Sequence, residues 1–174
     1  MPSYSEAWLE AVASCPPSER TYDTVQLDHP SFGEPAYIVA NVADDMQFGI
    51  EPGAAINAGQ MVTFIACPFK APWPEQREGQ PPVAKVEIDN VARELVPKVR
   101  AALGYRSYIT VTHRQYLESD RGEPAYGPIS FILSNVTLIG TKLSGEVRVK
   151  NLQNKRFPKL DKNYSYTDFP SLLP

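Results

Sequence analysis

The chain has 174 residues, of which 43% are apolar and 21% are charged, and a formal net charge of −3. This length and composition fit one globular domain with a core. The acidic balance argues against nonspecific binding to nucleic acid. No apolar run has the roughly 18 residues of a membrane span. The 17 prolines argue against an all-helical protein, because proline fixes φ and cannot donate a backbone hydrogen bond.

A short helix is predicted over Ser3–Ser14, near the N-terminus. Ser5 suits the cap position, and Glu6 falls in the first turn, where the helix dipole favours an anion. Cys15-Pro16-Pro17 would end the helix. The N-terminus has no basic region followed by an apolar one, so we expect a chain that is soluble and not exported.

Three strands are predicted in the part of the chain that follows. Residues 21–27 alternate in polarity, residues 36–42 are rich in β-formers, and residues 31–35 make a hairpin-length connection between them. Met61–Ala66 is apolar throughout, which predicts a strand buried on both faces.

Charged side chains are distributed unevenly. Residues 1–60 hold nine acidic side chains and one basic, whereas residues 142–162 hold seven basic and two acidic. Ends of opposite charge attract within one molecule or between subunits of a head-to-tail ring, although two solvated faces without a partner are an equally good interpretation. Asp44, Asp45 and Glu51 are interpreted as turn and surface residues, because their spacing does not fit a calcium loop.

A proline-rich loop is predicted over residues 68–82, with Phe69 and Trp73 among five prolines. Loops of this length in compact domains are usually functional or disordered. The two large aromatic side chains indicate that part of the loop docks against another surface.

The stretch Val83–Leu103 passes directly from a strand pattern into a helix pattern. Apolar and charged residues alternate at its start, and then apolar residues recur every four positions, which predicts the main helix at about residues 90–103. Asp89 or Asn90 would cap this helix. Pro97 lies inside it, so we expect a kink or two short pieces.

The remaining strands are expected at 105–116 and, after a turn at 119–124, as a pair at 129–139 and 142–149. The fold class is therefore predicted to be mainly β (α+β). We expect an antiparallel β-sandwich or barrel of about seven strands, flanked by the main helix and by the short N-terminal helix.

The last part of the chain, residues 157–174, is too apolar for a solvated tail, and its prolines keep it extended. We expect residues 1–156 to form a single domain and 157–174 an arm that lies on the surface of its own domain or of a neighbour. An assembly interface, buried only when subunits meet, is predicted from these residues: Phe69, Trp73, Phe157, Leu160, Tyr164, Tyr166 and Phe169.

No constellation of residues points to catalysis. Cys67 and His113 would form a nucleophilic triad with an Asp, yet both fall at strand positions where buried residues are usual, and neither has a local motif. A zinc site would need both of them to converge with Cys15 and His29. We therefore expect no enzyme, no cofactor and no metal; whether Cys15 and Cys67 are reduced or form a disulfide stays open.

Three motifs mark the body of the chain: HPSF at His29–Phe32, FIACPF at Phe64–Phe69 and IDNVARELV at Ile88–Val96. They resemble an uncharacterised family encoded in the tail modules of tailed bacteriophages and prophages. Near the C-terminus, Arg156-Phe157-Pro158 and Phe169-Pro170 are similar to closing motifs of phage tail-tip proteins. The resemblance spans most of the chain, from about residue 22 to its end.

The resemblance implies a structural part of the virion near the distal end of the tail tube, with no catalytic residues to carry over. The predicted function is a non-enzymatic component of the tail tip or distal tail that acts through contacts between subunits. Expected partners are other phage tail proteins and further copies of the chain in a ring, with no nucleic acid and no membrane. The expected location is the virion tail, and the bacterial cytoplasm during assembly.

The alternative function is a stand-alone β-sandwich module that binds a peptide or a carbohydrate, with Trp73 and nearby tyrosines as its platform. A concave aromatic groove would favour this module, and a flat exposed patch would favour assembly. An enzyme would instead need Cys67 and His113 within hydrogen-bonding reach.

Overall fold

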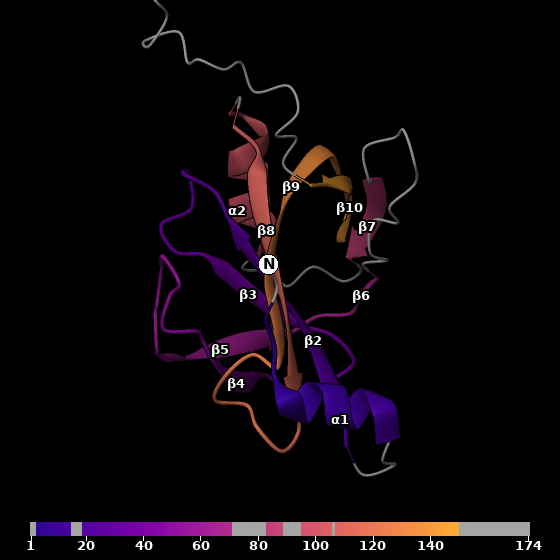
Figure 1. Ribbon diagram of the computed structural model, residues 1–174. Helices are drawn as coiled ribbons and strands as arrows, with labels where there is room; N and C mark the ends of the chain where they lie inside the picture. The colour runs from indigo at the N-terminus through magenta and orange to yellow at the C-terminus, as the bar shows by residue number, and fades with distance from the viewer. Residues whose placement is uncertain (1–2, 15–18, 71–82, 89–94, 106, 150–174) are drawn as a thin grey trace, which may run out of the picture.

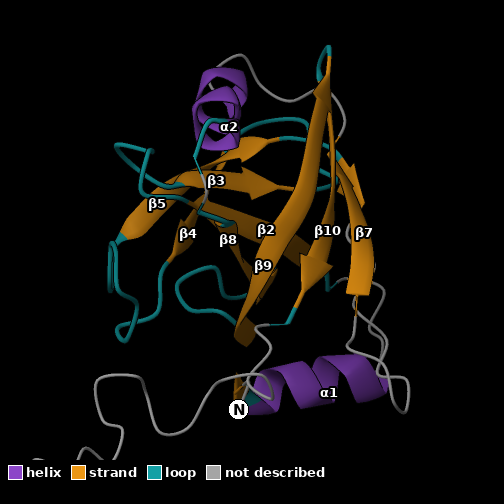
Figure 2. Cartoon of the chain, turned by 90° about the horizontal axis from the view of Figure 1, so that it is seen from above, coloured by secondary structure: helices purple, strands orange, loops and turns teal. Residues whose placement is uncertain are grey.

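One strongly curved sheet dominates the molecule (Figures 1 and 2). The computed structural model describes residues 3–14, 19–70, 83–88, 95–105 and 107–149. The strands are β1 (Ser3–Tyr4), β2 (Thr21–Asp28), β3 (Ala36–Val39), β4 (Met46–Gly49), β5 (Met61–Ala66), β6 (Phe69–Lys70), β7 (Val83–Ile88), β8 (Ile109–Leu117), β9 (Tyr126–Ile139) and β10 (Lys142–Arg148). The helices are α1 (Glu6–Ser14) and α2 (Leu95–Leu103).

The mainly β fold class and both helices are confirmed. The sheet has ten strands where about seven were expected. The additional strands β1, β4 and β6 have only two to four residues each, too few for a polarity pattern to reveal them.

Hydrogen bonding orders the strands β4-β5-β3-β2-β8-β9-β10-β7-β6, and β1 pairs with the start of β9. Among the described pairs, β3 and β5 are parallel and the others are antiparallel. The sheet is not closed into a barrel, because its path ends at β4 on one side and at β6 on the other. The barrel, one of the two predicted architectures, is therefore wrong. The sheet is open, and it is mixed because β3 and β5 are parallel.

The first core lies on the concave side of this curl. Leu95, Val99 and Ala102 of α2 are buried there against side chains from β2, β3, β7, β8, β9 and β10. Their spacing of three and four residues is the apolar stripe that the sequence predicted. Figure 2 shows α2 beside the curled sheet, where it covers this core.

Proline does not disturb α2 as the structure describes it. The helix begins at Leu95, whereas residues 89–94, including the expected cap at Asp89 or Asn90, lie outside the described ranges. Pro97 is the third residue of the described helix. The predicted kink, or division into two short pieces, depends on the backbone of residues 89–94, which lies outside the described ranges, so it stays a prediction.

The second core lies on the other side of β2 and β8, where β4 and β5 cover them. It is rich in aromatic rings, and those of Phe48 and Tyr116 have centroids 4.7 Å apart. The Tyr116 hydroxyl donates to the Gly49 carbonyl at 2.7 Å. The expectation that β5 is buried on both faces is wrong: Phe64 is fully buried, but Met61 is 54% exposed, because one face of β5 covers this core and the other faces solvent.

Helix α1 lies across one end of the sheet (Figure 1). Its predicted cap is confirmed, since the backbone N–H of Trp8 donates to Ser5 Oγ at 3.1 Å. The Trp8 ring stacks on Tyr126 of β9 with a centroid separation of 5.7 Å. Neither helix in the described part of the chain is long and apolar enough to cross a membrane.

Candidate functional site

A polar recess of about 320 Å³ lies on the same side of β2 and β8 as the second core. It is bounded by β2, β8, β9 and the loop that follows β4. Its polar residues continue the rows that hold Tyr22 and Tyr116 in the second core, because every second side chain of a strand points to the same face. Its polar and charged lining residues include Gln26, Asp28, Glu51, Thr112, Arg114 and Ser130.

Arg114 is the buried charge of this recess, with only 3% of its side chain exposed. Its Nε donates to Oε2 of Glu51 at 2.6 Å and its Nη2 donates to Oε1 of the same carboxylate at 2.8 Å. Nη1 donates to Oε1 of Gln26 at 2.8 Å. This two-pronged pairing fixes the guanidinium and fastens the loop after β4 to the sheet.

The interpretation of Glu51 as a surface residue is therefore wrong. Its side chain is 19% exposed and its partner, Arg114, lies 63 residues further along the chain. No local signal could have revealed this pair, since only the folding of the loop over the sheet brings the two residues together. Asp44 and Asp45 are exposed, as expected of surface residues, and Asp45 Oδ1 accepts a hydrogen bond from the backbone N–H of Ala66, at the end of β5, at 2.8 Å.

The outer part of the recess is lined by oxygen atoms. The hydroxyl oxygens of Thr112 and Ser130 lie 3.2 Å apart on neighbouring strands. The side chain of Asp28, which is half-buried, has no hydrogen bond or ion pair among the contacts within the described ranges. Since Arg114 is matched by Glu51, Asp28 gives the recess one net negative charge.

His113 lies on the opposite face of β8, between β2 and β9. It is 1% exposed, and its Nε2 is 3.2 Å from Oδ1 of Asp23, which also accepts a hydrogen bond from Gln115 at 2.5 Å. Burial lowers the pKa of His113, and the Asp23 carboxylate opposes this shift only in part. Burial alone would raise the pKa of Asp23, but the hydrogen bonds from His113 and Gln115 lower it below its usual value.

Cys67, the other residue considered for a triad, is buried directly after β5, within the first core. Its backbone N–H donates to the carbonyl of Val39 at 3.0 Å. Its surroundings in that cluster are apolar, as expected for a small core residue. That the chain is not an enzyme stays a prediction.

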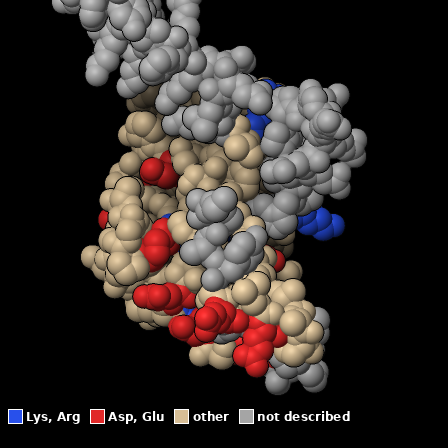
Figure 3. Space-filling view, viewed as in Figure 1, with Lys and Arg blue, Asp and Glu red and all other residues tan. Residues whose placement is uncertain are grey.

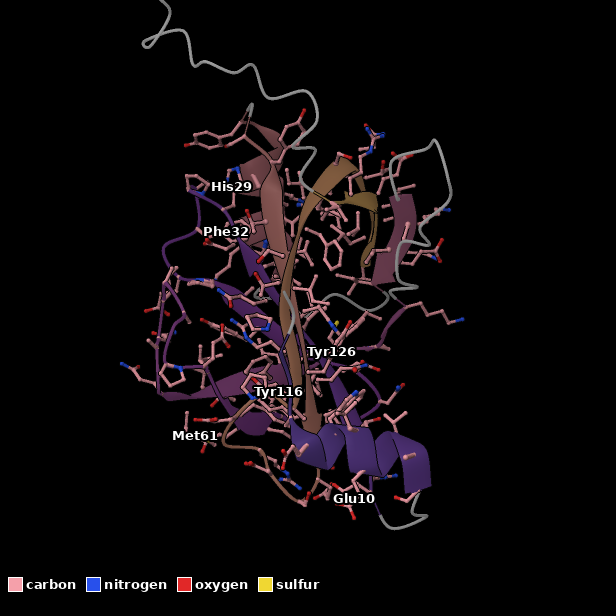
Figure 4. All side chains as sticks on the ribbon, in the orientation of Figure 1. Glu10, His29, Phe32, Met61, Tyr116 and Tyr126 are labelled. Atoms are coloured by element: carbon pink, nitrogen blue, oxygen red, sulfur yellow. The ribbon has the colours of Figure 1, made fainter. Side chains whose placement is uncertain are left out.

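His29, which opens the first of the recognised motifs, ties two connections together. Its Nδ1 accepts a hydrogen bond from the backbone N–H of Ser31 at 3.0 Å, and its Nε2 lies 2.7 Å from Ser107 Oγ. Phe32 packs against the same ring (Figure 4), with centroids 5.5 Å apart. His29 therefore holds the turn after β2 against the segment that leads into β8.

Of the predicted assembly residues, only Phe69 falls within the described ranges; Trp73, Phe157, Leu160, Tyr164, Tyr166 and Phe169 lie outside them. Phe69 is on β6 and is partly buried against the first core. It therefore packs already in the single chain, contrary to the expectation that assembly alone buries it. Within the described ranges no three His, Cys, Asp or Glu side chains gather where a metal could bind.

Comparison with known families finds a match over most of the chain. The model of a family described as "Domain of unknown function (DUF1833)" matches residues 7–161, which is most of the chain. No curated protein matches the sequence significantly.

Proposed function

Since the chain belongs to the DUF1833 family of domains of unknown function, we propose its role from its own geometry and motifs: it is a structural, non-enzymatic component of a phage or prophage tail. It acts through contacts between subunits at the tail tip or distal tail. Its partners are other tail proteins and further copies of itself.

An open sheet edge with an apolar tip carries the proposal of subunit contacts. Strand β8 begins at Ile109, opposite Leu133 of β9, so residues 134–139 of β9 extend past it and no described strand pairs with them on that side. Ile139 at the end of this extension is 75% exposed, and Tyr108 beside its base is 63% exposed. Figure 2 shows the end of β9 at the tip of the sheet; on its other side this end pairs with β10 as far as Ile139. Unpaired strand edges with exposed apolar residues are surfaces that a second chain can extend or cover.

The tail assignment rests on the resemblance of the motifs. Described residues of these motifs have structural roles: Phe64 is buried in the second core, Cys67 is buried in the first core, and His29 contacts two connections. Residues with such roles specify a fold, so the motifs support common architecture and leave the function to be tested.

The first test is the mass of the purified full-length protein in solution at low and high salt. We expect an oligomer, and we expect Ile139→Lys to weaken it because the charge would lie at the contact. Met61→Lys, at another exposed apolar residue on β5, is the matched control and should leave the mass unchanged. Monomers at every concentration and salt would contradict self-assembly.

The tail location is tested separately, in particles of the phage or prophage that encodes the chain. The protein should be recovered in purified tails at a fixed ratio to the other tail proteins. Its absence from assembled tails would overturn the assignment, whatever the mass of the isolated protein.

The alternative, a stand-alone module for a peptide or carbohydrate, has the polar recess in its favour. None of the described residues that line that recess is aromatic, which weakens the case for stacking against a sugar ring. Another recess of about 270 Å³, between β3, β5 and α2, is lined by Tyr37, but this ring is itself buried in the second core. Saturable binding of a soluble glycan or peptide by a monomer would favour the module.

A further inference from the structure

The polar recess has the chemistry of a seat for a cationic side chain. Arg114 and Glu51 neutralise each other, and the Asp28 carboxylate adds a negative charge without a described partner. The hydroxyl oxygens of Thr112 and Ser130 add neutral acceptors. A lysine ammonium brings three donors and a positive charge, so one carboxylate with neighbouring hydroxyl groups satisfies it.

We propose that this recess binds a basic side chain from residues 150–162 of a second copy of this chain. That segment is the strongly basic part of the sequence outside the described ranges. Its charged residues are Lys150, Lys155, Arg156, Lys159, Lys162 and the single acid Asp161. The choice of a second copy, rather than the chain's own segment, rests on the proposed function of assembly through subunit contacts.

The segment has the reach that such a contact needs. Arg148 at the end of β10 pairs with Ile132 of β9, two residues along that strand from Ser130 of the recess. The seven residues from 150 to 156, which carry the proposed side chain, span at most about 25 Å when extended. Strand β10 therefore ends near one recess, and the residues after it are long enough to enter the recess of a subunit that packs directly against it.

An apolar contact completes the fit. Ile56 lines the recess and is 37% exposed, so a hydrophobic ring can cover it. Phe157 directly follows Arg156 in the sequence. With Lys155 or Arg156 at Asp28, Phe157 covers Ile56, and the contact combines charge attraction with burial of apolar surface.

Two single substitutions in the full-length protein test the seat, and each removes one negative charge. Asp28→Asn should raise the dissociation constant of the oligomer by roughly tenfold, because a carboxylate partner is lost at the contact. Glu10→Gln is the control, since Glu10 is exposed on α1 and outside the recess (Figure 4). Sedimentation velocity over a range of protein concentrations measures both constants, and thermal unfolding checks that each variant is folded.

A mixing experiment identifies the occupant. Asp28→Lys replaces the negative charge of the recess with a positive one. The double variant Lys155→Glu/Arg156→Glu replaces two positive charges of the segment with negative ones. Each should be a monomer where the wild type assembles, whereas their mixture should form heterodimers, because one variant keeps the segment and the other keeps the recess.

The outcomes separate this inference from the proposed function. If the wild type assembles and Asp28→Asn assembles as well as Glu10→Gln does, the recess is not the seat, although assembly stands. If the mixture gives no heterodimer, or cross-linking joins residues 150–162 to the recess of the same chain, the second copy is ruled out as the occupant. A wild type that never assembles overturns both.

Discussion

At the scale of single residues, the described structure pairs the buried guanidinium of Arg114 with the mostly buried carboxylate of Glu51. Both groups leave water on folding, and their mutual hydrogen bonds offset that cost only while the two stay together. An arginine and a glutamate that are ordinary in the sequence thereby become positions where substitution is costly.

Arg114→Met should lower the free energy of unfolding by about 3 kcal/mol, because it leaves the Glu51 carboxylate without its partner in a mostly buried site. Arg148→Met is the control, since the Arg148 side chain is 49% exposed and its pair with Glu146 lies at the surface. Urea unfolding of both variants gives the comparison. Equal effects would show that the buried pair contributes no more than a surface pair.

Acid should destabilise the fold through His113. Burial lowers the pKa of His113 below its usual value of 6.5, so at mildly acidic pH the unfolded chain binds a proton that the folded chain does not. The free energy of unfolding therefore falls as the pH drops below about 6.5, and above that pH His113 contributes no pH dependence. Asp23 affects stability at lower pH, because its pKa in the folded chain lies below the usual 3.8. The stabilisation that its carboxylate provides is lost only as the pH falls near and below that value.

The measurement is urea unfolding at about pH 7.5 and about pH 5.5, on the two sides of the unfolded pKa of histidine. The wild type should lose more stability between these two pH values than His113→Gln, which cannot take up the proton. An identical loss in both proteins would assign the pH dependence to other groups.

At the scale of elements, two contacts decide how β4 and β5 are held over the second core. The Arg114 and Glu51 pair holds the loop after β4, and the turn between β8 and β9 holds the end of β4. In the second contact Gly49 donates its backbone N–H to the carbonyl of Arg121 at 2.8 Å. This approach leaves no room for a side chain, since a Cβ on Gly49 would overlap the carbonyl oxygen of Gly122.

Gly49→Ala should therefore cost about 2 kcal/mol or more in the free energy of unfolding, because backbone on one side must shift. Gly33→Ala is the matched control, as a Cβ there meets nothing within 4 Å. Thermal and urea unfolding measure both variants. If Gly49→Ala is no less stable than Gly33→Ala, the turn and β4 do not pack as closely as the structure shows.

At the scale of the whole molecule, one sheet serves two cores. Strands β2 and β8 direct alternate side chains to opposite sides, with Val25 and Val111 in the first core and Tyr22 and Tyr116 in the second. Acidic side chains gather toward the end where α1 lies (Figure 3). A molecule with acidic and apolar surfaces at separate places, together with a basic C-terminal segment, is suited to directional contacts between subunits.

The sequence by itself determined the longer elements and the fold class. Alternation of period two indicated β2, β8 and β10, the stripe of α2 followed from its spacing of three and four residues, and Ser5 identified the start of α1. Such features depend on neighbouring residues in the chain, so a local pattern records them.

Only the tertiary structure decided the rest. The parallel pairing of β3 with β5, the open path of the sheet and the exposed side of Met61 depend on which strands meet. The recess depends on a loop that brings Glu51 to Arg114, 63 residues away, and on strands that place Asp28 near Ser130. Contacts between residues far apart in the chain leave no periodic signal in a single sequence, which is why the elements were predictable and the candidate site was not.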